Sequence, residues 1–151
     1  MKHYFAIILS LVCTAGLLIA VNGCHKEDDD DSISNTLLLR GTTMKINMAL
    51  FAQYDDFYNF DLDAGGEHGV HGYGGFEAAW IGKTTDLKGP FFMSFNPQDG
   101  GSSIDPVIKS GTVKITEVKG GLHILVEAVE ENGQKLKIDV LAEDEFKKNW
   151  D

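Results

Sequence analysis

Apolar and polar residues alternate with a period of two through much of the chain that follows Asn35. The stretches that carry this pattern are residues 44–50, 58–62, 91–95, 113–116, 122–126 and 136–140. Successive side chains of a β-strand point to opposite faces, so this pattern buries one face and leaves the other in water. We therefore expect an all-β domain of half-buried strands, in which the even-numbered residues from Met44 to Leu50 share one buried face.

Two turn signals predict an antiparallel, three-stranded meander over residues 111–141. Gly120 and Gly121 separate its first two strands, and Asn132-Gly133 separates the second from the third. An Asn-Gly pair suits a type I′ hairpin turn, in which both central residues have positive φ. Because three strands with one apolar face need a partner layer, we expect an antiparallel β-sandwich or a small, partly open barrel of about seven or eight strands.

Some segments do not follow the alternation. Residues 65–75 are rich in glycine, which predicts a mobile loop or a pair of tight turns with no fixed strand register. Residues 98–103 predict a second loop of this kind. The stretch over residues 142–150 is consistent with a helical turn, a last strand or a frayed end.

The N-terminus has the layout of a secretory signal. Lys2 precedes an apolar run from Tyr4 to Val21, and Cys24 follows directly after Asn-Gly. The sequence Val-Asn-Gly-Cys resembles the lipobox of bacterial lipoproteins. The resemblance implies a diacylglyceryl group on the thiol of Cys24, cleavage before Cys24 and acylation of the new amine. Two or three acyl chains would anchor the protein stably; the alternative is an uncleaved signal anchor.

An acidic run begins directly behind this cysteine. Lys26, Glu27 and Asp28 start it, and it continues to Asp31. The arrangement resembles the export signal of surface lipoproteins of Bacteroidota. That resemblance implies an outer-membrane location facing the exterior, with the lipoprotein maturation and export machinery as partners. The physical alternative is a solvated spacer, since like charges repel one another and keep the chain extended.

The layout as a whole is similar to the small β-rich surface lipoproteins of Bacteroidota. Apart from the N-terminus, the resemblance rests on residues 81–87 and on the meander of residues 110–138. These proteins share no catalytic motif that can be carried over to this chain. The expected organisation is a signal peptide at 1–23, an acidic tether at 24–35 and one β domain at 36–151, held at the membrane by the lipid on Cys24.

The acidic composition bears on possible partners. The formal net charge is -10, whereas phosphate binding needs clustered Lys and Arg, so nucleic acid is not an expected partner. Of the two cysteines, Cys13 lies within the apolar run, so the mature domain has no obvious disulfide pair. We expect no cofactor.

Residues 61–71 contain a candidate metal site, because imidazole and carboxylate groups are ligands for Zn²⁺ and carboxylates bind Ca²⁺. An EF-hand frame is excluded because Gly72 occupies the position of its final acid. The simpler alternative is a set of solvated acids and loop histidines. The candidate ligands are Asp61, Asp63, Glu67, His68 and His71.

Aromatic residues provide a candidate ligand site. Tyr54, Tyr73 and Trp80 could stack on sugar rings, with packing in the core as the alternative. No motif for nucleophilic, zinc or phosphate chemistry is present. We therefore expect a non-catalytic binding or accessory domain for a glycan, a peptide or a partner protein. The alternative function is a carboxylate- or metal-dependent hydrolase acting on extracellular glycans or peptides.

Overall fold

The computed structural model describes residues 32–148. The chain divides into two units after Ser32, and the second unit, Ile33–Asp151, contains the β domain. The predicted signal peptide, the lipidation site at Cys24 and the acidic residues 26–28 lie outside the described residues. Within residues 32–148, no helix has the length and apolar character needed to cross a membrane.

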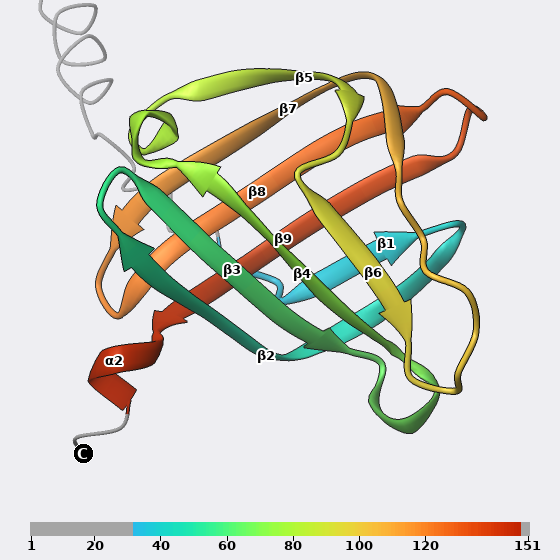
Figure 1. Cartoon of the computed structure of the whole chain (residues 1–151), viewed down its shortest axis with the longest axis horizontal. Coiled ribbons are helices and arrows are strands. Elements are labelled where there is room, and N and C mark those ends of the chain that lie inside the picture. The colour runs from blue at the N-terminus through green and yellow to red at the C-terminus, as the bar shows by residue number, and fades with distance from the viewer. Residues whose placement is uncertain (1–31, 149–151) are drawn as a thin grey trace, which may run out of the picture. The chain divides into compact units, whose positions relative to one another are not determined.

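The domain is all-β, as predicted. Nine strands form one sheet in the order β5-β7-β8-β9-β1-β2-β3-β4-β6, and the sheet curls around without closing (Figure 1). The strands are β1 (Thr36–Leu39), β2 (Thr42–Tyr54), β3 (Phe57–Ala64), β4 (Val70–Glu77), β5 (Thr84–Pro90), β6 (Met93–Pro97), β7 (Val107–Val118), β8 (Gly121–Glu130) and β9 (Lys135–Asp144). Neighbouring strands are antiparallel except where β2 and β9 also meet in parallel.

The predicted meander of β7, β8 and β9 is confirmed. Val113 pairs with Val126, Val126 pairs with Ile138, and all three are buried. The predicted type I′ turn in the second hairpin is wrong, because only Gly133 has a positive φ there, at 84°. Asn132 instead accepts a hydrogen bond from the backbone N–H of Gln134 through its side-chain oxygen, at 2.8 Å. A longer loop that ends in a left-handed glycine serves the same hairpin.

β2 changes its buried face part-way along its length. The register against β3 shifts between Ile46 and Met48, which marks a β-bulge. Beyond it Ala49 is buried in the core and Phe51 packs against the core, whereas Met48 and Leu50 are only half-buried. The expectation that Met48 and Leu50 share the buried face of Ile46 is therefore wrong, because one extra residue inverts the alternation.

Residues 65–69 of the glycine-rich stretch form a turn, as predicted, whereas, contrary to the prediction, residues 70–75 belong to strand β4. It pairs with β3 on one side and β6 on the other. A Cβ atom on Gly74 would lie 2.1 Å from the carbonyl oxygen of Phe92, and one on Gly72 would lie 3.0 Å from the ring of Phe95. Neighbouring groups occupy the space that a side chain would need at these positions. Glycine is therefore accommodated in the strand where a larger residue would clash. With β1 and β5, this strand adds to the six alternating stretches and brings the sheet to nine strands.

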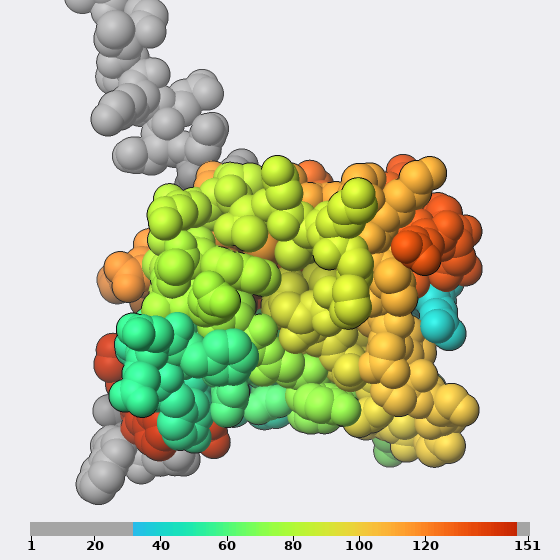
Figure 2. Space-filling view, turned by 45° about the horizontal axis from the view of Figure 1, so that its top comes forward, coloured from blue at the N-terminus to red at the C-terminus, as the bar shows by residue number. Residues whose placement is uncertain are grey.

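One hydrophobic core fills the inside of the curled sheet. Every strand contributes buried side chains to it, and Phe60, Phe76 and Phe95 are among the largest that are fully buried. In the space-filling view, the chain from η2 (Ala78–Trp80) to the start of β7, coloured lime to gold, covers one face of the domain (Figure 2). Because the interior is packed with side chains, the places left for a ligand are the ends of the barrel and its outer face.

Candidate functional site

A pocket of about 620 Å³ opens at one end of the barrel. The β2–β3 hairpin, the β7–β8 turn and α2 (Glu145–Lys148) gather at this end, on the left of Figure 1. The parallel contact of Phe51 with Asp144 brings the end of β9 to β2. The lining side chains that bear on its chemistry are Phe51, Tyr58, Glu117, Glu143, Asp144 and Lys147.

Tyr58 presents a buried ring and a polar tip to the pocket. The residue is 8% exposed, and its ring stacks on Phe76 with centroids 5.3 Å apart. Its hydroxyl makes no hydrogen bond with any residue in the described part of the chain. Burial raises the pKa of Tyr58, and the negative charges of Glu117 and Asp144 raise it further. The pocket therefore contains a protonated phenol that is subject to the negative charge of two carboxylates.

Carboxylates determine the charge of this pocket. Glu117, Glu143 and Asp144 line it, together with the ammonium group of Lys147. Nζ of Lys147 lies 3.8 Å from Oδ2 of Asp144, and the lysine side chain is 87% exposed, so the pair is weak. The arrangement suits a ligand that offers hydrogen-bond donors or positive charge.

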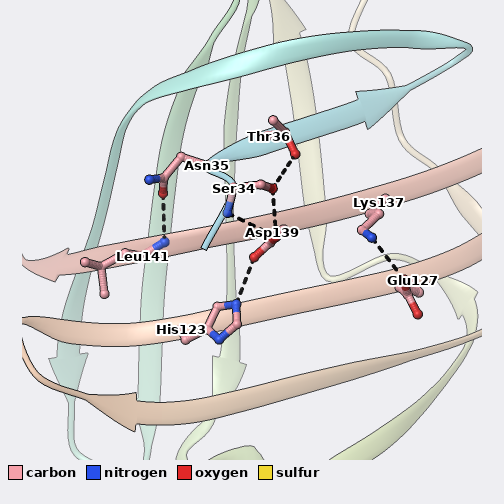
Figure 3. A network of polar contacts seen from close by, with 8 residues as sticks. All are labelled: Ser34, Asn35, Thr36, His123, Glu127, Lys137, Asp139 and Leu141. Atoms are coloured by element: carbon pink, nitrogen blue, oxygen red, sulfur yellow. Dashed lines mark hydrogen bonds and ion pairs between the residues drawn. The ribbon is translucent and has the colours of Figure 1, made fainter. Parts of the chain in front are cut away.

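The structure also brings a serine, a histidine and an aspartate together on the outside of the sheet (Figure 3). Nε2 of His123 lies 2.8 Å from Oδ1 of Asp139, and the hydroxyl of Ser34 donates to Oδ2 of Asp139 at 2.7 Å. A catalytic triad needs the histidine between the other two, so that it can take the proton of the serine. Here the aspartate lies between the serine and the histidine. Its hydrogen bonds hold the start of the domain against β9.

The five predicted metal ligands do not converge on one point. Across β3 and β4, Oδ1 of Asp63 lies 2.8 Å from Nδ1 of His71. Asp61 precedes Asp63 by two residues on β3, whereas Glu67 and His68 are exposed on the short helix η1 (Gly66–His68). Within residues 32–148, no group of three or more His, Cys, Asp or Glu side chains is placed to hold a metal ion. The chain leaves β3 before Glu67, and so separates it from the acids of that strand.

The three predicted aromatic ligand residues lie in different places. Tyr54 is 54% exposed and lies beside Phe146 of α2, with ring centroids 6.4 Å apart. Tyr73 is 46% exposed on β4. Trp80 packs against the core and makes an edge contact with Phe92 at 5.6 Å. The expected shared patch is therefore not formed, and none of the three residues lines the pocket.

The alternation over residues 58–62 predicts that Tyr58 lies on a buried face, which is confirmed, but it does not indicate the pocket. Glu117 follows the alternating part of β7, and Asp144 ends β9. Neither residue belongs to a motif with a recognised spacing. Glu117 and Asp144 lie near each other only because the ends of their strands come together in the folded domain. The local sequence pattern does not contain this information. No protein family, curated protein or solved structure matched this chain in the comparisons.

Proposed function

We propose that this chain is a lipoprotein, anchored to the outer membrane through acyl chains on Cys24 and displayed on the cell surface. In this proposal its β domain binds a ligand without catalysing a reaction, at the open end of the barrel. The support for the anchor is the lipobox-like sequence before Cys24 and the acidic run behind it. The support for binding is the pocket.

The observation that carries the binding proposal is the composition and size of that pocket. A volume of about 620 Å³ falls within the range of small-ligand sites. The rings of Phe51 and Tyr58 have centroids 5.8 Å apart and offer an apolar surface. The carboxylates of Glu117 and Asp144 offer acceptors at the same place. Apolar surface with a few convergent polar groups is the usual make-up of a ligand site.

The anchor and the display are tested by adding protease to intact cells that express the full chain. The native protein is compared with Cys24→Ala and with a variant in which Lys26, Glu27 and Asp28 are all alanine. We expect the native protein to be digested, the triple variant to be protected but still bound to the membrane, and Cys24→Ala to be released from it.

Two results would contradict this part of the proposal. Protection of the native protein in intact cells would mean that it faces the periplasm and that the acidic run is only a spacer. Membrane retention of Cys24→Ala would indicate that the apolar N-terminus stays in place as an uncleaved anchor. Digestion of permeabilised cells is the control for protease access.

A hydrolase acting on glycans remains the second candidate, because the pocket contains more than one carboxylate. Glycoside hydrolysis uses a pair of acids, one as an acid and the other as a base or nucleophile. Glu117 and Asp144 both act on the pKa of Tyr58 and so lie near the same group. Release of reducing ends from polysaccharides by the native protein, and its loss in both Glu117→Gln and Asp144→Asn, would favour this candidate over simple binding.

A further inference from the structure

We propose that the pocket at the end of the barrel binds a primary aliphatic amine. The ammonium group would lie between the carboxylates and the hydroxyl of Tyr58, and the alkyl stem would lie against the two aromatic rings. The amine would come either from a free diamine or from the lysine side chain of a peptide. This inference rests on the proposed function, for which it names the class of ligand.

The charge of the lining selects a cation. Among the described residues that line the pocket, Glu117, Glu143 and Asp144 carry carboxylates and Lys147 carries the one ammonium group. An anionic ligand would be repelled there, whereas an ammonium group would be attracted more strongly than in open water because the walls exclude part of the solvent.

The hydroxyl of Tyr58 adds an observation that is independent of the acids. Its side chain is more than nine-tenths buried, at 8% exposure, and reaches the pocket with no hydrogen-bond partner among the described residues. The hydroxyl oxygen itself is open to solvent, since among the described residues the one fully buried side-chain polar atom without a partner is Oε1 of Glu130. An ammonium group has three donors and no acceptor, so it can donate to the phenol oxygen and to carboxylates at once.

The aromatic rings suit the rest of such a ligand. Phe51 and Tyr58 lie 5.8 Å apart between centroids and are tilted by 47°. Their faces and edges can cover methylene groups, and an aromatic face attracts a nearby cation. A neutral diol of the same length would make the same contacts between its methylene groups and the rings, but its hydroxyl ends would lack the attraction of a cation to the carboxylates.

Lys147 already places an ammonium group at the edge of the pocket, where it is weakly bound. Its ammonium group stands 3.8 Å from Asp144, while its side chain is 87% exposed. Such an exposed pair is held loosely, so an incoming amine can replace it. Removal of this lysine should therefore strengthen the binding of an external amine. Changes to Glu117 or Tyr58 should weaken it.

The test is calorimetric titration of the full chain, purified in non-ionic detergent at low ionic strength. The probes are cadaverine, a blocked Gly-Lys-Gly peptide and 1,5-pentanediol, which matches cadaverine in length without its charge. We expect both amines to bind and the diol not to bind. Glu117→Gln should weaken binding about tenfold and Tyr58→Phe about fivefold, and Lys147→Ala should strengthen it about threefold.

The matched control is Glu131→Gln, which removes the same charge from the exposed turn between β8 and β9. It should leave amine affinity unchanged. The tighter of the two amines identifies the source as free diamine or peptide lysine. Equal weakening by Glu117→Gln and Glu131→Gln would overturn the proposal, because it would reveal general attraction to an acidic protein. Absence of amine binding would overturn it too.

A fourth probe, maltose, separates this inference from the proposed function. If maltose binds with dependence on Glu117 and Tyr58 while both amines fail, the amine class is wrong and the binding site stands. If amines, maltose and the diol all fail to bind, the amine inference and the binding site fall together. The protease result on the anchor is independent of either outcome.

Discussion

At the scale of single residues, Asp139 has the clearest structural role. Burial by itself raises the pKa of its carboxyl group, but hydrogen bonds from the side chain of Ser34, from His123 and from the backbone of Ser34, together with the charge of His123, hold that pKa below its usual value. The net effect is that the native fold favours the charged form. Asp139 thereby links β8, β9 and the segment that enters β1 (Figure 3).

Replacement of Asp139 by asparagine should lower the free energy of unfolding by about 1 to 2 kcal/mol at pH 7. Because the folded-state pKa of Asp139 is depressed, the stabilisation by its charged carboxylate is fully present above the unfolded pKa of about 3.9. It is lost as the pH falls through the lower, folded-state pKa. Urea unfolding of both proteins from pH 7 to pH 2.5 measures the difference.

The comparison variant for this prediction is Asp86→Asn, on an exposed position of β5. It should change the free energy of unfolding by less than about 0.5 kcal/mol at every pH. A difference between native protein and Asp139→Asn that stays constant down to pH 2.5 would show that the charge of Asp139 is not what stabilises the fold.

At the scale of elements, β4 illustrates how packing can override strand propensity. Gly75 would place a Cβ atom 2.4 Å from the ring of Phe57, and Gly74 would place one 2.1 Å from the carbonyl oxygen of Phe92. Glycine weakens an isolated strand. Here its absent side chain lets β4 lie close to the chain leading into β6, so the three-dimensional packing compensates for the poor local propensity.

Gly74→Ala should therefore destabilise the domain by about 2 to 3 kcal/mol, the cost of forcing an extra methyl group into a filled space. The matched variant is Gly101→Ala in the following loop, where the nearest atom to an added Cβ is a side-chain carbon of Pro97 at 3.3 Å. Thermal unfolding of the two variants makes the comparison. Similar melting temperatures would mean that β4 is not packed as closely as described.

At the scale of the whole molecule, the hydrogen bonds of the residues just before β1 bear on where the folded domain begins. The β domain begins at Ile33, earlier than the expected start at residue 36. Asn35 accepts a hydrogen bond from the backbone of Leu141 at 3.1 Å, and its own carbonyl accepts one from Ile46 at 2.8 Å. The last residues of the expected tether are thus part of the folded domain.

A chain that begins at Ile33 should unfold with the same free energy as one that begins at Cys24, to within about 0.5 kcal/mol. A chain that begins at Thr36 loses the bonds of Ser34 and Asn35 to β9, and should be less stable by about 2 kcal/mol. Urea unfolding of the three chains tests this. Equal stability of all three would place the domain start at residue 36.

The candidate site could be predicted only in part. The alternation predicts that Tyr58 lies on the inner face, whereas the sequence indicates Tyr54, Tyr73 and Trp80 as candidate ligand residues. The distinction depends on which strand ends meet, and that depends on the order of strands in the sheet. Glu117 and Asp144 acquire a role only because β7, β9 and β2 end at the same rim.

The sequence by itself determined the β class, the meander of β7, β8 and β9, and the inward side of most strands. These follow from a period of two and from turn residues, which act over a few neighbouring positions. The tertiary structure alone decided the bulge in β2, the glycine-containing strand β4 and the acidic pocket. Each of these depends on atoms brought together from distant parts of the chain. The space and the charge at these places, and not local propensity, determine the structure that forms.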